Sequence, residues 1–417
     1  AWTPTTKDRV FGDAAVKVLV RAPQNVIIYP QQLLGRKFGD SHVAEAVSSH
    51  LPFTVTEDTV RGSYLINVNG PAGDAATLTP EEAMGMLLRY FKRLAESEKA
   101  TATGVSTVVR DIVVTVPSYL TYHERLALID AAALADFHVI STLNAPTAFA
   151  ITYAFERVEN ETKRVAIVDI GASGMEIAWT TVSGDIDPKT NRSTTTVTVN
   201  GLTWEPTVGG RDFISRLAEF MMEKVKADKS DRKLWYRALA EAEKVMEALS
   251  VNKDKRFKVV SPERDYEGTI SREEFELLIK DILARIEKPI TKGLDDLEWA
   301  SIDSVQIVGG ATRIPCVQTT ILAAFSGKAT DLSRHISGDE GGVYGAGYYA
   351  ATSSSSHRSA KKLIVKDSTP FAISAKALGT ETKLFKAMSR IGSKKTLTLG
   401  TASDLDVSLF YTDGAPR

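Results

Sequence analysis

Cysteine is almost absent from this sequence, and so are charge imbalance and long apolar runs. The single cysteine, Cys316, excludes an intramolecular disulfide and leaves too few thiols for a zinc cluster. The formal net charge of −1 gives no electrostatic reason for binding nucleic acid or an anionic membrane. Asn144 and Pro146 interrupt the least polar stretch, residues 139–155, so a buried strand and a buried helix explain it better than a membrane span.

The periodicity of the chain changes near its C-terminal end. A length of 417 residues predicts two or three domains, because one hydrophobic core rarely organises so many. Helical and strand patterns alternate up to residue 352, and the polar stretch SSSSHRSAKK at 353–362 has the composition of a linker. Residues 363–417 then alternate as β-strands do, with turn residues between them. We therefore expect an α/β body at 1–352, a linker at 353–362 and the start of an all-β domain at 363–417.

Two capping boxes predict where helices begin. Thr79 pairs with Glu82, and Ser271 pairs with Glu274, in the spacing that satisfies free amides at a helix N-terminus. The first box opens TPEEAMGMLLRYFKRLAES, residues 79–97, which has the pattern of an amphipathic helix. Its predicted apolar face consists of Met84, Leu87, Leu88, Phe91 and Leu94.

The stretch AIVDIGASGMEIAW, residues 166–179, contains a glycine-rich loop after a buried strand. A dinucleotide-binding turn must open a helix, whereas the residues after GASG have strand character, so the loop is predicted to be a hairpin tip. Consecutive backbone N–H groups at such a tip can cradle phosphate, and Asp169 at its mouth could hold a hydrated magnesium ion. An ordinary turn with a solvated aspartate fits the same pattern.

A second small-residue loop occurs in VQIVGGATRIP, residues 305–315. Gly309 and Gly310 end a buried strand and would let a flat ring lie against the backbone, and Arg313 could stack on an adenine face. A simple packing turn has the same pattern. Taken together, the two strand–loop segments suit two similar lobes that close on one nucleotide.

Six motifs, in this order and spacing, resemble the heat-shock seventy chaperone family: LLGRKFGD, DIVVTVPSYL, VDIGASGMEIA, TVGGRDF, VQIVGGATRIPCVQ and ISGDEGGVYGAGYYAA. The resemblance covers nearly the whole chain. It implies an α/β, actin-like two-lobed ATPase-type fold, N-terminally incomplete, followed by the beginning of an all-β substrate-binding domain.

Within that family the chain is similar to the large, divergent branch. DIGASG, QQLLGRKFGD and TKLFKAMSRIGSKKTLTL are most like the glucose-regulated chaperones of about one hundred and seventy kilodaltons in the endoplasmic reticulum, and the heat-shock one-hundred-and-ten branch is next. This likeness implies a location in the endoplasmic reticulum lumen, with the cytoplasm as the alternative. Sequons at Asn160 and Asn191 fit a luminal protein.

The resemblance also implies ATP or ADP with Mg²⁺ as ligands and gives individual residues a role. It implies a phosphate loop of Gly171, Ala172, Ser173 and Gly174, with phosphate or ribose contacts at Gly209 and Gly210. It implies an adenosine pocket of Gly309, Gly310, Ala311 and Arg313, with purine and ribose contacts at Glu243 and Ser250. Asp339 would close the site, and Asp169 would be the carboxylate next to the magnesium ion.

Several departures from the family pattern argue against hydrolysis. The family's first phosphate loop is absent from this sequence, Gln31 stands in place of the catalytic lysine, and Ala145 stands in place of an acidic residue. The Lys-Arg pair that contacts adenosine is replaced by Met246 and Glu247. An amide cannot supply the charge of a lysine, and losing one such donor lowers the rate on the order of 10²–10³-fold. The lost carboxylate also loosens the magnesium shell. No catalytic residue is therefore assigned.

Three functions are compatible with the sequence. The first is an ATP-binding chaperone of the stress response with weak or no hydrolysis, which acts as nucleotide exchange factor and holdase for a heat-shock seventy partner of the same compartment and for unfolded polypeptides. The second is an active ATPase chaperone. Gln31 and Ala145 favour the first function over this one. The third is a small-molecule kinase on the actin-like fold, which leaves the β-strands of residues 363–417 unexplained.

Overall fold

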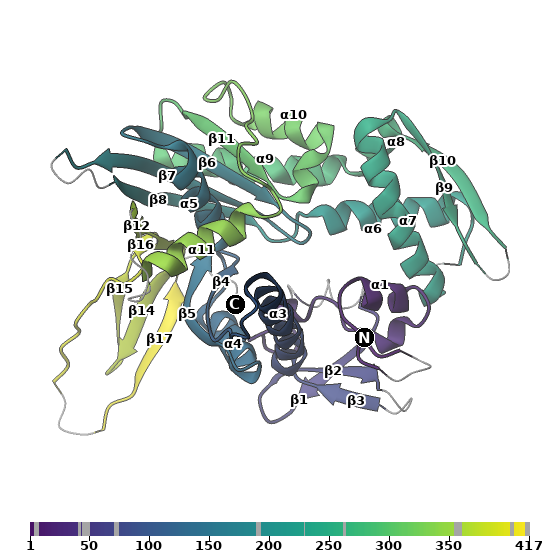
Figure 1. The fold of residues 1–417 in the computed structure, drawn as a ribbon, viewed down its shortest axis with the longest axis horizontal. Coiled ribbons are helices and arrows are strands. Elements are labelled where there is room, and N and C mark those ends of the chain that lie inside the picture. Colours follow the sequence, from purple (N-terminus) through teal and green to yellow (C-terminus); the bar gives the residue numbers. More distant parts are fainter. Residues whose placement is uncertain are drawn as a thin grey trace. The chain divides into compact units, whose positions relative to one another are not determined.

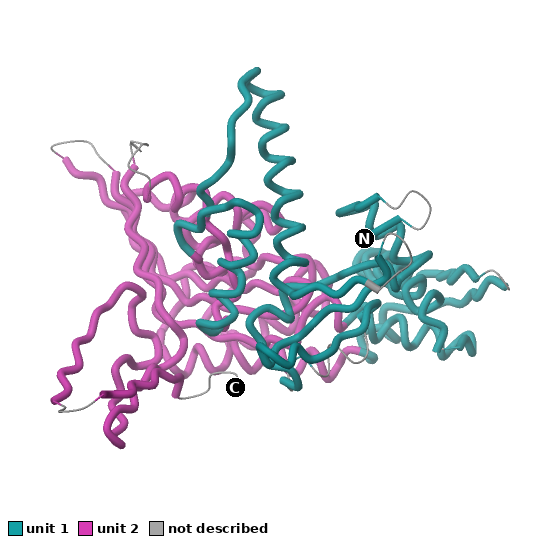
Figure 2. The backbone as a smooth tube through the Cα atoms, turned by 90° about the horizontal axis from the view of Figure 1, so that it is seen from below, with its two compact units in different colours: residues 1–112, 121–141, 213–278 teal, residues 113–120, 142–212, 279–417 magenta. Residues whose placement is uncertain are grey.

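The computed structural model describes residues 1–3, 8–40, 43, 51–70, 75–188, 193–228, 230–261, 264–353, 361–400 and 404–412. The chain forms two compact units, which Figure 2 colours separately. Unit 1 comprises residues 1–112, 121–141 and 213–278, and unit 2 comprises residues 113–120, 142–212 and 279–417. Within the described residues, no helix is both long enough and apolar enough to cross a membrane.

Unit 1 combines helices with two small antiparallel sheets. Its helices are α1 (Asp13–Leu19), the short 3-10 helices η1 (Pro23–Asn25) and η2 (Pro30–Gln32), α3 (Pro80–Thr103), α4 (Tyr122–Leu134), most of α6 (Gly210–Lys224), α7 (Arg232–Val251) and α8 (Arg272–Leu278). One sheet has the order β1 (Thr54–Asp58), β2 (Ser63–Asn69) and β3 (Ala75–Leu78), and the other pairs β9 (Asp254–Val259) with β10 (Tyr266–Ser271).

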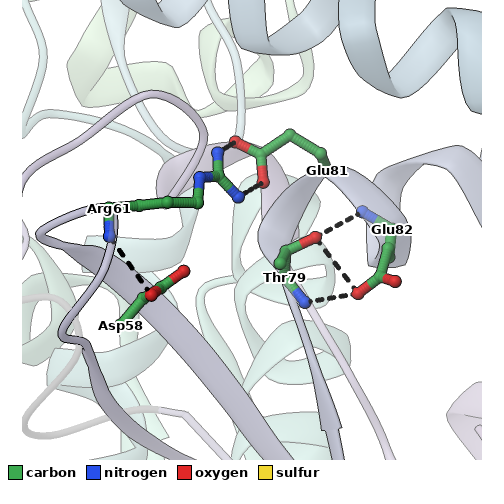
Figure 3. A network of polar contacts seen from close by, with 5 residues as sticks. All are labelled: Asp58, Arg61, Thr79, Glu81 and Glu82. Atoms are coloured by element: carbon green, nitrogen blue, oxygen red, sulfur yellow. Dashed lines mark hydrogen bonds and ion pairs between the residues drawn. The ribbon is translucent and has the colours of Figure 1, made fainter.

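Both predicted capping boxes form. The Thr79 hydroxyl accepts a hydrogen bond from the Glu82 amide at 3.1 Å, and the Glu82 carboxylate accepts one from the Thr79 amide at 2.8 Å (Figure 3). At the start of α8, Ser271 and Glu274 exchange the equivalent bonds. Figure 3 also shows Arg61 on the β1–β2 turn, forming a bidentate ion pair with Glu81 in the first turn of α3.

The predicted apolar face of α3 is only partly buried. Leu88 is 9% exposed, whereas Phe91 and Leu94 are 49% and 43% exposed. The reason is the length of α4: Arg89 and Lys92 of α3 already donate to the backbone carbonyls of Leu134 and Asp136 at the end of α4. The rest of α3 therefore extends past the helix that covers its first turns.

Unit 2 is built on a five-stranded sheet with helices on both faces (Figure 1). The strand order is β11 (Ser304–Val308), β6 (Thr162–Ile170), β7 (Met175–Ile186), β8 (Ser193–Glu205) and β12 (Lys361–Lys366), with β6, β7 and β8 antiparallel and both edge strands parallel to their neighbours. Helices α5 (Ala145–Arg157) and α11 (Gly341–Ser353) pack together on one face, and α9 (Lys280–Leu297) with α10 (Pro315–Ala324) on the other.

The packing of α9 requires a glycine. Trp179 of β7 is fully buried, and a Cβ on Gly293 of α9 would lie 2.2 Å from its indole ring. No side chain other than hydrogen fits there, so Gly293 allows the helix to lie directly on the tryptophan. The opposite face of the sheet is filled by a cluster that includes Ile167, Ala178 and Phe149.

Short strands dominate the C-terminal part of unit 2. They are β13 (Ser368–Thr369) paired with β16 (Ser389–Arg390), and an antiparallel sheet in the order β15 (Thr380–Phe385), β14 (Ala372–Ala377) and β17 (Val407–Thr412). The predicted linker at 353–362 falls mainly on residues 354–360, which lie outside the described residues. The proposed boundaries of the body, linker and β domain stay predictions.

Two strands are divided between the units. β4 (Asp111–Val116) and β5 (His138–Asn144) pair with each other, and the segment of unit 2 that begins at Val113 within β4 includes Pro117, Ser118 and Tyr119. The predicted strand DIVVTV, residues 111–116, is thereby confirmed.

Candidate functional site

The GASG loop is the tip of an antiparallel hairpin, as its flanking strand character predicts. β6 ends at Ile170, β7 begins at Met175, and the Gly171 amide donates to the Gly174 carbonyl at 3.2 Å. Within the described residues, the amides of Ala172 and Ser173 have no hydrogen-bond acceptor. The tip therefore presents two consecutive free N–H groups, which is the arrangement that backbone anion sites use.

The N-terminus of α6 is fixed against this tip. The Gly210 amide donates to the Gly171 carbonyl at 2.9 Å, and the Arg211 amide donates to the Ala172 carbonyl at 2.8 Å. A Cβ on Gly209 would lie only 2.5 Å from the Ala172 carbonyl oxygen, so the close approach depends on glycine.

A third loop, which follows the end of β11, lies at the same hairpin tip. Gly309 has φ +85°, and a Cβ there would lie 2.3 Å from the Ile170 carbonyl oxygen and 2.6 Å from Oδ1 of Asp169. The 3-10 helix η3 (Gly310–Arg313) follows and leads into α10. A Cβ on Gly210 would lie 3.8 Å from the Cβ of Ala311, so all three loops converge.

Asp169 is the charged residue at the centre of these loops. It is half-buried at the end of β6, and burial raises its pKa from 3.8 to about 6. Among the residues that the structure describes, no donor forms a hydrogen bond or ion pair with its carboxylate. A desolvated carboxylate without a partner is unfavourable by itself and becomes favourable when a cation binds beside it.

Glu176 is a second carboxylate here, and it is not among the site residues predicted from the sequence. The strand register places Glu176 directly opposite Asp169, so both side chains lie on the same face of the hairpin. Both the amide and the hydroxyl of Ser118 donate to Oε2 of Glu176 at 2.6 Å. The available signal was an acidic residue two positions after the loop, in the otherwise apolar stretch MEIAW that begins the strand.

Arg313 and Asp339 form an ion pair at 2.8 Å at the edge of these loops. Both side chains are largely exposed, at 65% and 72%, so the pair contributes little stability. Gly338, beside Asp339, lies against the strand end, since a Cβ there would be 3.4 Å from the Gly309 amide. Their predicted adenosine-contacting and closing roles stay predictions.

The remaining predicted residues lie elsewhere in the fold. Glu243 and Ser250 belong to α7 in unit 1, where the Ser250 hydroxyl donates to the Met246 carbonyl at 3.0 Å. Gln31 is exposed in η2, also in unit 1, and Ala145 is the first residue of α5 in unit 2. The roles of these four residues in nucleotide binding and hydrolysis stay predictions.

The residues that converge in unit 2 fit a phosphate-bearing ligand with its metal. A Cβ on Gly171 or Gly310 would meet nothing within 4 Å, so there is open space beside these two glycines. Within the described part of the chain, no group of three or more His, Cys, Asp and Glu residues could hold a metal ion. A magnesium ion at Asp169 would therefore complete its shell with water and phosphate oxygens, as Mg²⁺ commonly does.

Comparisons with known proteins show which family the chain resembles. A family model described as "Hsp70 protein" matches residues 1–410. The curated relative "Heat shock 70 kDa protein" of Trichophyton rubrum is 30% identical over 412 residues, covering 96% of this chain and 60% of the relative. The chain thus spans about 60% of that relative's length. These matches confirm the predicted fold class, an actin-like ATPase-type α/β fold followed by the beginning of an all-β domain. The chain belongs to the Hsp70 family.

Proposed function

We propose that this chain binds ATP and ADP with Mg²⁺ at the converging loops of unit 2 and serves as a molecular chaperone that hydrolyses ATP weakly or not at all. One observation carries the proposal: three small-residue loops, two free amides and a carboxylate without a partner meet at one place. Anions are held by such amides, and a cation would neutralise Asp169. Hsp70-family membership supports the ligand class.

Each group has a separate part in binding. The amides of Ala172 and Ser173 would donate to phosphate oxygens, and the glycine loops would let the phosphates and the nucleoside approach the backbone. Asp169 would hold the hydrated metal ion, while Ser118 fixes the neighbouring Glu176 in position. The bound metal supplies charge neutralisation on the phosphates.

Weak hydrolysis follows from two side chains. Gln31 and Ala145 supply no charge, whereas phosphoryl transfer depends on charge placed around the transferred phosphate. Nucleotide would then act as a conformational ligand, since a ligand that prefers one conformation shifts the population without being hydrolysed. We extend this proposal to the divergent branch, with exchange of nucleotide on a heat-shock seventy partner, passive holding of unfolded polypeptides and a location in the endoplasmic reticulum lumen.

An active ATPase chaperone is the second candidate. It is favoured by the Asp169–Glu176 pair, because two carboxylates on one face of the hairpin can orient a hydrated metal ion. Hydrolysis would then depend on these carboxylates in place of a lysine. The rate of a single turnover separates the two candidates.

Binding is tested by calorimetric titration of the protein with Mg·ADP, with inorganic phosphate and adenosine as partial ligands. We expect Asp169→Asn to weaken Mg·ADP binding on the order of tenfold or more, as loss of a metal-side charge does. Asp331→Asn, an exposed aspartate in unit 2, is the matched control and should bind as the wild type does. Unchanged affinity in Asp169→Asn would refute the site.

Function is then tested with two assays. Single-turnover ATP hydrolysis should be at least about 10²-fold slower than in a family member that has the lysine. Release of fluorescent ADP from a heat-shock seventy partner should accelerate when this protein is added. A hydrolysis rate equal to the reference would favour the active ATPase, and unaccelerated ADP release would remove the exchange role.

A further inference from the structure

Unit 1 contains a separate pocket between the N-terminal segment and helix α3. Its volume is about 540 Å³, and it is lined by Trp2, Arg9, Phe11, Glu82, Gly85, Met86, Arg89, Tyr90, Arg93 and Leu134. Pockets that hold small organic molecules have volumes of about 300–1,000 Å³ and combine an apolar lining with a few polar groups. This pocket has the size and the lining for one such molecule.

The apolar part of the lining is aromatic and pre-arranged. The rings of Phe11 and Tyr90 stack with their centroids 4.8 Å apart and an interplanar angle of 11°. Trp2 is 5% exposed and lies under the guanidinium of Arg9, which is 5.6 Å from its ring centroid. Flat aromatic walls favour a flat apolar ligand, since offset stacking adds to the burial of its surface.

The charged part of the lining is cationic. Arg9, Arg89 and Arg93 line the pocket, and Arg89 is anchored by the Leu134 carbonyl at 2.9 Å and by Asp136 at 3.0 Å. Arg9 and Arg93 have no carboxylate partner among the described residues. Two guanidinium groups therefore remain available to an anion, and a planar guanidinium matches a carboxylate with two parallel hydrogen bonds.

Among the described residues, one acidic residue lines the pocket, and it is already engaged. Glu82 accepts from the amide and the hydroxyl of Thr79 at 2.8 Å and 3.2 Å, and Figure 3 shows its carboxylate turned onto Thr79. Its charge is held at the start of α3, where the helix dipole also favours it. Glu82 is therefore a poor partner for the two free arginines.

We propose that this pocket binds a planar aromatic carboxylate, with the ring against Trp2, Phe11 and Tyr90 and the carboxylate on Arg9 and Arg93. The site is separate from the nucleotide loops, because all of its lining residues belong to unit 1. Recognition requires both parts of the ligand, since the rings supply apolar contact and the guanidinium groups supply the charge-assisted hydrogen bonds.

The test uses Trp2 as a built-in reporter in the whole protein. The chain contains five tryptophans, so it is labelled with 5-fluorotryptophan and the Trp2 resonance is assigned with Trp2→Phe. Titrations with 2-naphthoate, with the neutral 2-naphthamide and with acetate separate the contributions of charge and ring. We expect 2-naphthoate to shift the Trp2 signal at concentrations at least about tenfold lower than the other two.

Arginine variants decide which residues carry the charge. Arg93→Gln should weaken 2-naphthoate binding about tenfold or more, as loss of a charge-assisted hydrogen bond does. Lys99→Gln removes an exposed cation from the same helix outside the pocket and should leave binding unchanged. Equal binding of 2-naphthamide, equal weakening by Lys99→Gln, or a Trp2 signal that no compound moves would each overturn the proposal.

Discussion

The Asp169 carboxylate should lower the stability of the ligand-free protein at neutral pH. Burial raises its pKa from 3.8 to about 6, so between these values the folded protein keeps a proton that the unfolded chain has released. The free energy of unfolding therefore falls as the pH rises through this window. Above about pH 6 the full penalty is present, and below about pH 4 it is absent. Asp169→Asn removes the ionisation, and with it the penalty.

The magnitude follows from the size of the shift. Two pKa units correspond to about 3 kcal/mol at 1.36 kcal/mol per unit. Because the side chain is only half-buried, we expect Asp169→Asn to raise the free energy of unfolding by about 1–3 kcal/mol at pH 7.5. The difference from the wild type should shrink to near zero at pH 4.

Urea unfolding of both proteins between pH 4 and pH 8, with EDTA and without nucleotide, measures this difference. Asp339→Asn is the control, since that carboxylate is 72% exposed and should change stability by less than about 0.5 kcal/mol. A difference that stays constant with pH, or a wild type that is more stable at pH 7.5, would refute the reasoning. With saturating Mg·ADP the order should reverse, because ligand binding stabilises the folded state and asparagine supplies no charge for the metal.

Three further predictions rest on individual contacts. Gly209→Ala should lower the free energy of unfolding by at least about 2 kcal/mol in urea, because its Cβ would lie 2.5 Å from the Ala172 carbonyl oxygen. Asp367→Ala should raise hydrogen exchange of the β12 amides on the order of 10²-fold, because three donors lose a buried carboxyl acceptor. Arg61→Gln should lower the free energy of unfolding by about 1–3 kcal/mol, because Glu81, 6% exposed, loses its ion pair.

Each of these changes has a matched control. Gly210→Ala should be tolerated, since its Cβ would have no neighbour closer than 3.7 Å. Asp367→Asn keeps an oxygen acceptor and should raise exchange less than alanine does. Arg110→Gln removes an exposed arginine of the same unit as Arg61 and should change stability by less than about 0.5 kcal/mol. If a control matches its test variant, the contact named for that variant does not carry the effect.

Local signals in the sequence were sufficient for the hairpin tip of the candidate site and for two helix starts in unit 1. Strand character on both sides of GASG predicted the hairpin tip, because a loop followed by Ile, Trp, Thr and Val cannot open a helix easily. The Thr79 and Ser271 capping boxes fixed two helix starts for a similar reason. In each case the interacting groups lie within a few residues of one another.

Contacts between distant segments could not be predicted in this way. Ser118 and Glu176 are 58 residues apart, and nothing near either residue indicates the other. The Asn144 amide donates to Asp367 at 3.1 Å across 223 residues. β12 likewise pairs with β8, although its own pattern indicated only a strand. The exposure of Phe91 and Leu94 depends on where α4 ends, which is also a property of the tertiary structure.

The two carboxylates on the β6–β7 hairpin are difficult to explain by stability alone. Two positions further from the tip, the same cross-strand pair is Ile167 and Ala178, which are fully buried and pack in the core. An apolar pair at Asp169 and Glu176 would continue that core without desolvating a charge. This penalty disappears when a cation binds at the tip, so the hairpin is better suited to the bound state than to the free one. Asp169, a perturbed carboxylate beside free amides, therefore lowers the stability of the free protein and favours the binding of a cation.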